Sequence, residues 1–374
     1  MHYSPAALRR WPDLEGPDLP AADAADRLIL DESAAARDAA PDGTVVVIGD
    51  GYGALTLGAA ADGDRGIRVH QDPLTGEQAL AANAERFSLA HAYRSRGLSS
   101  DLVQGARVVL LRLPRALDAL DDIAGLIAAH ADPAVVVFGG GRVKHMTTAM
   151  NGILGERFER VDVTHARQKS RVLVARGPRA GRDPEPRCQA HEGLTVCAFG
   201  GAFAGTGIDI GTRFLLEHLP DPVQLVRLAV DEPVIDLACG TGVVAATLAL
   251  RHPGLRVYAC DQSAAAVASA RATAAANGVA DRVEVARDDM LRSRPDGQAA
   301  FIALNPPFHV GAAVSDDIAP RLFADAARAL RPGGQLWAVW NSGLRYRAAL
   351  EGLVGPTRQV ARNAKFTVTA SVRR

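Results

Sequence analysis

Short apolar runs that end in a glycine turn occur in both halves of the chain. In the second half, VIDLACGTG (residues 234–242) is followed by an alanine-rich helical stretch and then by RVYACD, which ends at Asp261. In the first half, TVVVIGDGYG (residues 44–53) is followed by a helical stretch and then by IRVHQD, which ends at Asp72. Apolar runs that alternate with helical stretches are typical of βαβ units, so each half is predicted to form a mostly parallel sheet.

The two halves share further signals in the same order. Gly240 and Asp261 are 21 residues apart, and so are Gly51 and Asp72. Each half then has an apolar run beside a proline, VVLLRLP or FIALNPP, and ends on a basic, β-rich segment, ARQKSRVLVA or ARNAKFTVTA. Ordered signals at equal spacing predict a duplicated domain, and therefore two tandem Rossmann-like α/β domains with doubly wound sheets.

A stretch rich in glycine, proline and arginine, GPRAGRDPEPRCQA, lies between the two halves at residues 177–190. This composition is typical of a domain boundary. We therefore expect a first domain at residues 1–178, a linker at 179–190 and a second domain at 191–374.

Composition excludes several classes of protein. The chain has 374 residues, of which 48% are hydrophobic and 22% charged, with 42 basic and 42 acidic side chains. This excludes disorder and a global basic field, so any nucleic-acid binding must be local. No apolar window reaches the length of a signal core or a membrane span, so we expect a cytoplasmic protein. The cysteines form no CxxC pair, and we expect reduced thiols and no metal site; they are Cys188, Cys197, Cys239 and Cys260.

The glycine turn of the second half indicates a nucleotide-like ligand. Glycines allow close approach of the ligand to the backbone, and Asp261, at the end of the next strand, can accept both ribose hydroxyls. Asp236 lies inside the first strand, and the turn lacks the third glycine of a GxGxxG motif, with Ala245 beyond Gly242. A carboxylate at residue 236 suits a ligand that carries positive charge, such as S-adenosylmethionine.

The motif Asn305-Pro306-Pro307-Phe308 ends an apolar run. Prolines fix a stiff turn, which would place the Asn305 amide at the carboxyl edge of the sheet. The amide oxygen and the Pro306 carbonyl can accept the two N–H bonds of a conjugated exocyclic amine and direct its lone pair at a methyl group. Phe308 can stack on the target base. The motif therefore predicts amine methylation without a strong general base.

These motifs together resemble the class I S-adenosylmethionine-dependent methyltransferases that modify exocyclic or amide nitrogens. The whole chain is similar to the ribosomal RNA guanine-N2 methyltransferases of the RsmC/RlmG type. The most specific features are His309 directly after NPPF, the segment FAGTGIDIGTRFLLEHLP at residues 203–220 and the closing NAKFTVTAS at residues 363–371. The resemblance implies that the second domain is catalytic and that the first is degenerate and serves stability or RNA binding.

The resemblance also implies roles for individual residues. Asp289, or Asp288 as the second candidate, would face the adenine amine, and Asp209, Gly211 and Thr212 would belong to a lid over the cofactor. Ala204 departs from the family, in which serine is frequent. His309 and Phe308 would contact the substrate, and the catalytic group would be Asn305, Pro306, Pro307 and Phe308. The expected cofactor-binding residues are Asp236, Ala238, Gly240, Gly242, Asp261, Gln262, Asp289, Asn305, Asp209 and Thr212.

The first half departs from this pattern. Val47 stands where the second half has Asp236, and Leu113-Pro114-Arg115-Ala116 stands where it has NPPF. Asp72 and the glycines of the turn remain, so residual cofactor binding stays open. Four basic residues are candidates for a phosphate-binding face, namely Arg112, Arg115, Arg142 and Lys144.

The expected function is therefore S-adenosylmethionine-dependent N2-methylation of a ribosomal RNA guanine, by a monomer acting on RNA or on a ribosomal subunit. A protein glutamine-N5 methyltransferase or a DNA adenine-N6 methyltransferase would use the same Asn-Pro-Pro chemistry. A pair of RNA-binding modules without activity and an enzyme of small metabolites are weaker alternatives. The residues leave the ribosomal subunit and the target guanine open.

Overall fold

The computed structural model describes residues 3–228, 232–307 and 312–374, which form two compact units. Unit 1 runs to Glu185 and also takes up Phe199–Gly201, and unit 2 contains Pro186–Ala198 and the chain from Ala202 to Arg374. Each unit holds one seven-stranded sheet. The strand orders, β3-β2-β1-β4-β5-β7-β6 and β12-β11-β10-β13-β14-β16-β15, are the same when the elements are matched in chain order.

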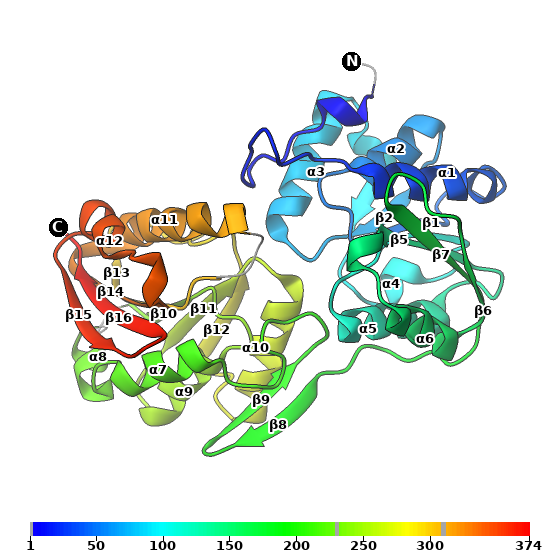
Figure 1. The fold of residues 1–374 in the computed structure, drawn as a ribbon. Helices are drawn as coiled ribbons and strands as arrows, with labels where there is room; N and C mark the ends of the chain where they lie inside the picture. Colours follow the sequence, from blue (N-terminus) through cyan, green and yellow to red (C-terminus); the bar gives the residue numbers. More distant parts are fainter. Residues whose placement is uncertain (1–2, 229–231, 308–311) are drawn as a thin grey trace. The chain divides into compact units, whose positions relative to one another are not determined.

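The strands of unit 1 alternate with helices (Figure 1). In both units the strand before the last is antiparallel to its two neighbours, and the other pairs are parallel. The elements of unit 1 are α1 (Ala24–Asp38), β1 (Val45–Ile48), α2 (Ala54–Asp62), β2 (Ile67–His70), α3 (Leu74–Arg86), β3 (Tyr93–Ser95), α4 (Ser100–Val103), β4 (Val108–Arg112), α5 (Leu117–His130), β5 (Val136–Arg142), α6 (Thr148–Arg157), β6 (Phe158–Val163) and β7 (Ser170–Pro178).

Unit 2 begins with a hairpin and two helices that precede its seven-stranded sheet. Its elements are β8 (Arg187–His191), β9 (Leu194–Ala198), α7 (Ile210–His218), α8 (Pro222–Leu228), β10 (Val234–Leu237), α9 (Val243–Arg251), β11 (Val257–Asp261), α10 (Ala264–Ala276), β12 (Val283–Arg287), β13 (Ala299–Leu304), α11 (Ala312–Ala329), β14 (Leu330–Asn341), α12 (Arg347–Leu353), β15 (Thr357–Arg362) and β16 (Phe366–Val372).

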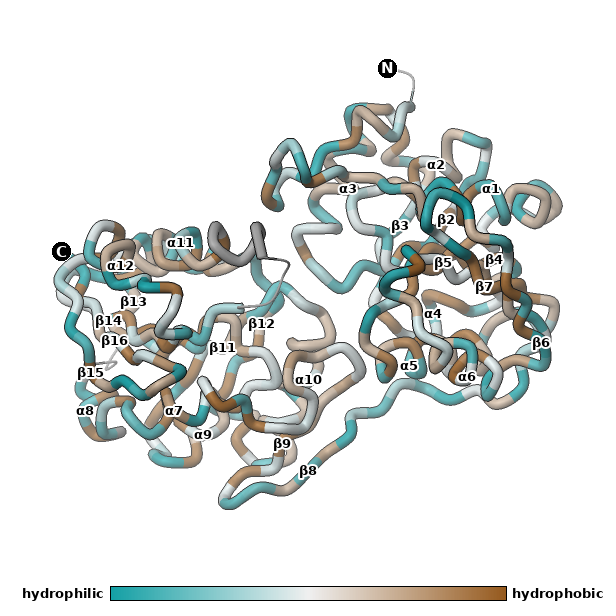
Figure 2. Tube along the Cα trace, in the orientation of Figure 1, coloured by the Kyte–Doolittle hydropathy of each residue, from teal (hydrophilic) through white to brown (hydrophobic). Residues whose placement is uncertain are grey.

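Each sheet is covered on both faces, as the continuous apolar runs of a parallel sheet require. In unit 2, side chains of α7, α9 and α10 pack on one face and those of α11 and α12 on the other. Figure 2 shows hydrophobic residues in the strands of unit 1, such as β5 and β7. The predicted α/β architecture with mostly parallel sheets is therefore confirmed.

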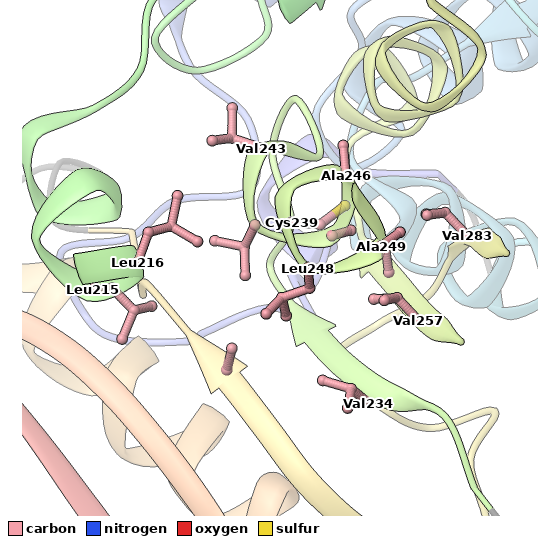
Figure 3. Close-up of a cluster of buried hydrophobic side chains, with 14 of the residues drawn as sticks. Leu215, Leu216, Val234, Cys239, Val243, Ala246, Leu248, Ala249, Val257 and Val283 are labelled. Carbon is pink, nitrogen blue, oxygen red and sulfur yellow. The ribbon is translucent and has the colours of Figure 1, made fainter. Parts of the chain in front are cut away.

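The central strand of unit 2 holds the site in place. Every residue of β10 is buried, and the strand lies between β11 and β13. Its Val234 joins a cluster that includes Leu216 of α7, Leu248 of α9 and Val257 of β11 (Figure 3). The packing holds the amino end of β10, and the pairing of Leu237 with Cys260 of β11 and Leu304 of β13 fixes the carboxyl end and the turn that follows it.

The expectation of four reduced cysteines is wrong for two of them. Cys188 of β8 and Cys197 of β9 are directly paired in the antiparallel register of the hairpin and form a disulfide. The hairpin brings the two Cα atoms to 4.0 Å. Cys239 and Cys260 are free and buried, as expected for small apolar side chains.

The stretch expected to be a linker packs against unit 1 at its start and forms a strand at its end. The Arg182 side chain pairs with Asp121 at 2.6 Å, and its backbone N–H donates to the Gly125 carbonyl of α5. Residues 187–191 then form β8. None of the helices in the described part of the chain is both long and apolar enough to cross a membrane.

Candidate active site

The turn after β10 has a left-handed backbone at three of its residues. Ala238 has φ 58°, Gly240 φ 52° and Gly242 φ 77°. A Cβ atom on Gly242 would lie 2.9 Å from Ala270 of α10, so packing excludes a side chain there. A Cβ on Gly240 would meet nothing within 4 Å, so the space beside Gly240 is open for a ligand to approach the backbone.

Asp261 connects this turn to the end of β11. Its carboxylate accepts from the backbone N–H of Gly240 at 3.0 Å and from that of Ser263 at 2.9 Å. Gln262 follows directly, and its backbone carbonyl accepts from Arg287 at 3.2 Å. The predicted ribose-binding carboxylate is therefore beside the predicted glycine turn.

Asp236 lies beneath the same turn. Its side chain is buried, and its carboxylate accepts from the backbone N–H of Ala245, in the first turn of α9, at 3.0 Å. Burial raises the pKa of Asp236 to about 7, and the charge of Asp261 adds to the rise. A positively charged ligand near this carboxylate would favour its ionised form.

The two acidic residues after β12 have different surroundings. The Asp288 carboxylate accepts from the backbone N–H of Ser293 at 3.0 Å and from its hydroxyl at 2.6 Å. The Asp289 carboxylate forms an ion pair with Arg292 at 3.1 Å, and burial raises the pKa of Asp289. Asp288 thus stabilises its own turn, whereas Asp289 is bound to a half-exposed cation.

Asn305 follows β13 and is held by the start of α7. Its Nδ2 donates to the Asp209 carboxylate at 3.1 Å and to the Thr212 hydroxyl at 2.9 Å. Its Oδ1 is buried and accepts no hydrogen bond from any residue that the structure describes. A buried acceptor without a partner is costly, which favours a ligand that donates to it.

The neighbours of Asn305 are only partly described. Pro306 is buried and Pro307 is exposed. The predicted substrate contacts Phe308 and His309 lie outside the described residues. Gly211 lies directly beside the Asn305 amide. A Cβ atom at residue 211 would be 2.9 Å from the Asp209 Oδ2 and 3.6 Å from the Asn305 Oδ1. Within residues 3–228, 232–307 and 312–374, no group of three or more metal-ligating side chains converges.

The register of unit 1 corrects two correspondences between the halves. Ile48 pairs with Leu111, as Leu237 pairs with Leu304, so Arg112 occupies the place of Asn305. The counterpart of NPPF is therefore Arg112-Leu113-Pro114-Arg115, one residue earlier than the sequence predicted.

The same register places Gln71, and not Asp72, in the position of Asp261, because Val47 pairs with Val69 as Asp236 pairs with Ala259. The Gln71 amide donates to the backbone carbonyl of Asp50 at 2.7 Å. An amide that donates to the turn thus replaces a carboxylate that accepts from it.

Arg112 was also predicted to contact phosphate, and the structure gives it other partners. Its guanidinium is 2.8 Å from Asp23 and 3.0 Å from Asp26. Only Arg115, Arg142 and Lys144 remain together, around His145, whose pKa is lowered by desolvation and by these three cations.

Comparisons with known proteins agree with this geometry. Residues 193–370 match the family described as Methyltransferase small domain, and residues 1–179 match the RLMG N-terminal domain. The chain is 35% identical to ribosomal RNA large subunit methyltransferase G of Streptomyces avermitilis, over 98% of this chain and 97% of that protein. It is 33% identical to the protein of the same name in Shewanella amazonensis, over 98% and 96% of the two chains.

A solved structure shares the fold. It is a 16S rRNA N2 methyltransferase of T. thermophilus, RsmC, in complex with AdoMet and guanosine. The TM-score is 0.74, with 20% sequence identity, and the match covers 94% of this chain and 92% of that one.

The buried Asp236 predicts a pH-dependent stability. Its pKa is about 7 in the folded chain and close to the ordinary 3.8 in the unfolded one. Between these values the folded state holds a proton that the unfolded state has lost, so the free energy of unfolding falls as pH rises, by about 1.4 kcal/mol per pH unit. In Asp236→Asn this contribution is absent.

Urea unfolding of both proteins between about pH 5 and pH 8 measures the difference. The stability of the unsubstituted protein relative to Asp236→Asn should fall up to about pH 7 and then level off. A difference that does not change with pH would contradict the burial of an ionisable carboxylate at this position.

Proposed function

Because this chain belongs to the ribosomal RNA large subunit methyltransferase G family, we propose that it transfers a methyl group from S-adenosylmethionine to the exocyclic N2 of a guanine in large-subunit ribosomal RNA. The observation that carries the proposed chemistry is the orientation of the Asn305 amide. Its Nδ2 is bound by two acceptors, and its Oδ1 is buried without a donor among the described residues. The Asn305 amide therefore offers one acceptor for one N–H bond.

This acceptor suits the chemistry of a guanine amine. The lone pair of the amine is delocalised into the ring, so the amine is a poor nucleophile until its N–H bonds are directed. Asn305 Oδ1 and the Pro306 carbonyl would each accept one of them and orient the lone pair away from the ring plane. When bound, S-adenosylmethionine supplies the electrophilic methyl group. The amine proton becomes acidic only after transfer, so no strong base is required at this site.

The other residues would hold the cofactor. Gly240 leaves room beside the backbone, Asp261 would accept the ribose hydroxyls and Asp236 favours positive charge near the methionine end. Asp289 would face the adenine amine, since the Asp288 carboxylate already accepts two bonds from Ser293. Ala238, Gly242 and Gln262 border the same turn. Phe308 and His309 would stack on and contact the base.

Unit 1 would bind RNA and not catalyse. Arg112 takes the place of Asn305, and a guanidinium has no acceptor for an amine N–H. The identical strand orders support an origin by duplication. Arg115, Arg142 and Lys144 would contact phosphates. We also propose action in the cytoplasm, where ribosomal RNA is found.

Analysis of ribosomal RNA nucleosides tests the reaction. Mass spectrometry of each subunit from cells with and without the gene should show loss of one N2-methylguanosine from the large subunit. A loss from the small subunit would keep the chemistry and change the substrate. Unchanged nucleosides in both subunits would contradict the function and favour a protein glutamine or DNA adenine as target.

Two substitutions separate catalysis from cofactor binding. Asn305→Ala should lower the rate of methyl transfer by about 100-fold or more and leave the Kd for S-adenosylmethionine unchanged, because the amide orients the amine. Asp261→Ala should weaken cofactor binding by about tenfold or more, through loss of charge-assisted hydrogen bonds. Calorimetry and single-turnover kinetics measure the two effects. Turnover retained in Asn305→Ala would refute the mechanism.

Removal of the three cations around His145 tests RNA binding by unit 1. In Arg115→Ala/Arg142→Ala/Lys144→Ala, the affinity for ribosomal RNA should fall, and the slope of log affinity against log salt should become shallower by about 2 to 3. The matched control is Arg160→Ala/Arg176→Ala, which removes two cations that are both paired with Asp162. Equal losses in both variants would show a diffuse charge effect and not a binding face.

A further inference from the structure

We propose that Asp209 is the positioning residue of the active site, because its carboxylate determines which end of the Asn305 amide faces the target amine. This inference rests on the proposed function and adds to it a residue that acts through Asn305. The contact on which it depends is the hydrogen bond from Asn305 Nδ2 to Asp209 Oδ2, at 3.1 Å.

The argument begins with the two ends of an amide. A half-turn of the Asn305 side chain about its last bond would exchange Oδ1 and Nδ2. The Thr212 hydroxyl would accept either arrangement, since it can donate or accept. An ionised carboxylate can only accept, so an oxygen of Asn305 facing Asp209 would be repelled. Asp209 therefore selects the arrangement in which Oδ1 is left for the amine.

The Asp209 carboxylate is itself held in place. It is the N-cap of α7 and accepts from the backbone N–H of Thr212 at 3.1 Å. Gly211 packs directly against it, and the Phe366 ring of β16 closes the far side of Gly211 at 3.2 Å from where a Cβ would be. The start of α7 thus fixes the orientation of the Asn305 amide, and this orientation does not depend on a bound substrate.

Unit 1 contains the same construction with different chemistry. Asp23 is the N-cap of α1 and accepts from the backbone N–H of Asp26, three residues later, as Asp209 accepts from Thr212. Arg112, at the position of Asn305, contacts both Asp23 and Asp26. The N-cap carboxylate holds the residue at the carboxyl end of the fourth strand of the sheet in both units, although unit 1 has no amide to orient.

The two units differ in the group that the N-cap carboxylate holds. A structural N-cap needs only the bond to its own helix, and both units have that bond. The N-cap carboxylate also makes a second bond, to the side chain at the end of the fourth strand. In unit 2 this side chain is the neutral amide of Asn305, which still offers its Oδ1 as an acceptor. In unit 1 the bond is an ion pair, and the side chain offers donors alone.

The test compares Asp209→Asn with Asp23→Asn, which changes the same position of the other unit. One oxygen, Asp209 Oδ2, accepts from both the Thr212 backbone N–H and Asn305 Nδ2. An amide at residue 209 can turn either its oxygen or its nitrogen to this point, so it no longer restricts Asn305 to one arrangement. We expect kcat for methyl transfer to ribosomal RNA to fall by about 10- to 100-fold in Asp209→Asn, with a small change in the Kd for S-adenosylmethionine. Asp23→Asn should lower the melting temperature and leave kcat unchanged.

An exchange variant tests the same contact by recovery of activity instead of by its loss. Asn305→Asp alone places two carboxylates in contact and should be inactive. Asp209→Asn/Asn305→Asp restores one donor and one acceptor across the contact and leaves an oxygen of residue 305 for the amine, while the new amide nitrogen no longer accepts from the Thr212 N–H. We therefore expect the double variant to recover activity relative to Asn305→Asp.

The outcomes distinguish this inference from the function on which it rests. If the unsubstituted protein methylates no ribosomal RNA, the proposed function fails. If it is active and Asp209→Asn keeps its kcat, the positioning role fails and the function stands. A raised Kd for S-adenosylmethionine with unchanged kcat would also overturn the positioning role, because Asp209 would then serve only the cofactor.

Discussion

Both units share one contact, between the residue at the carboxyl end of the fourth strand of the sheet and the N-cap of a helix that comes before the sheet in the chain. Parallel strands end at the same edge of a sheet, so polar groups collect there and need partners. Asn305 and Asp209 satisfy each other in unit 2, and Arg112 and Asp23 do so in unit 1. The contact joins a helix to the sheet edge over a separation of about 90 residues, which positions the edge for ligand binding or closes it.

Much of this arrangement could be predicted from the sequence because it depends on local patterns. The apolar run before Gly240 is a strand, Asp261 ends the next one, and the two meet through a backbone hydrogen bond. The strand before Asn305 was equally clear from its apolar run and the two prolines that end it. The parallel sheet then places these groups at one edge, as the order of elements along the chain requires.

Register and long-range pairing could not be predicted in the same way. The equal spacing to Asp72 and Asp261 concealed a one-residue difference in loop length, and only strand pairing shows that Gln71 replaces Asp261. The shift from Leu113 to Arg112 has another cause, because the register matches Pro114 with Pro307 and not with Pro306. Cys188 pairs with Cys197 because both lie in a hairpin. The glycine and proline content of residues 177–190 predicted a linker and gave no sign of this hairpin.

The close approach of Gly242 to Ala270 gives the alanine-rich helix α10 a meaning beyond its propensity. Two helices that start from neighbouring strands can converge on the same turn only if both present almost no side-chain volume there. The glycine turn therefore limits which residues α10 can have at position 270, although the turn itself contains no residue of α10. A single added methyl group on either side would act as a wedge, and the ligand-facing backbone would bear the displacement.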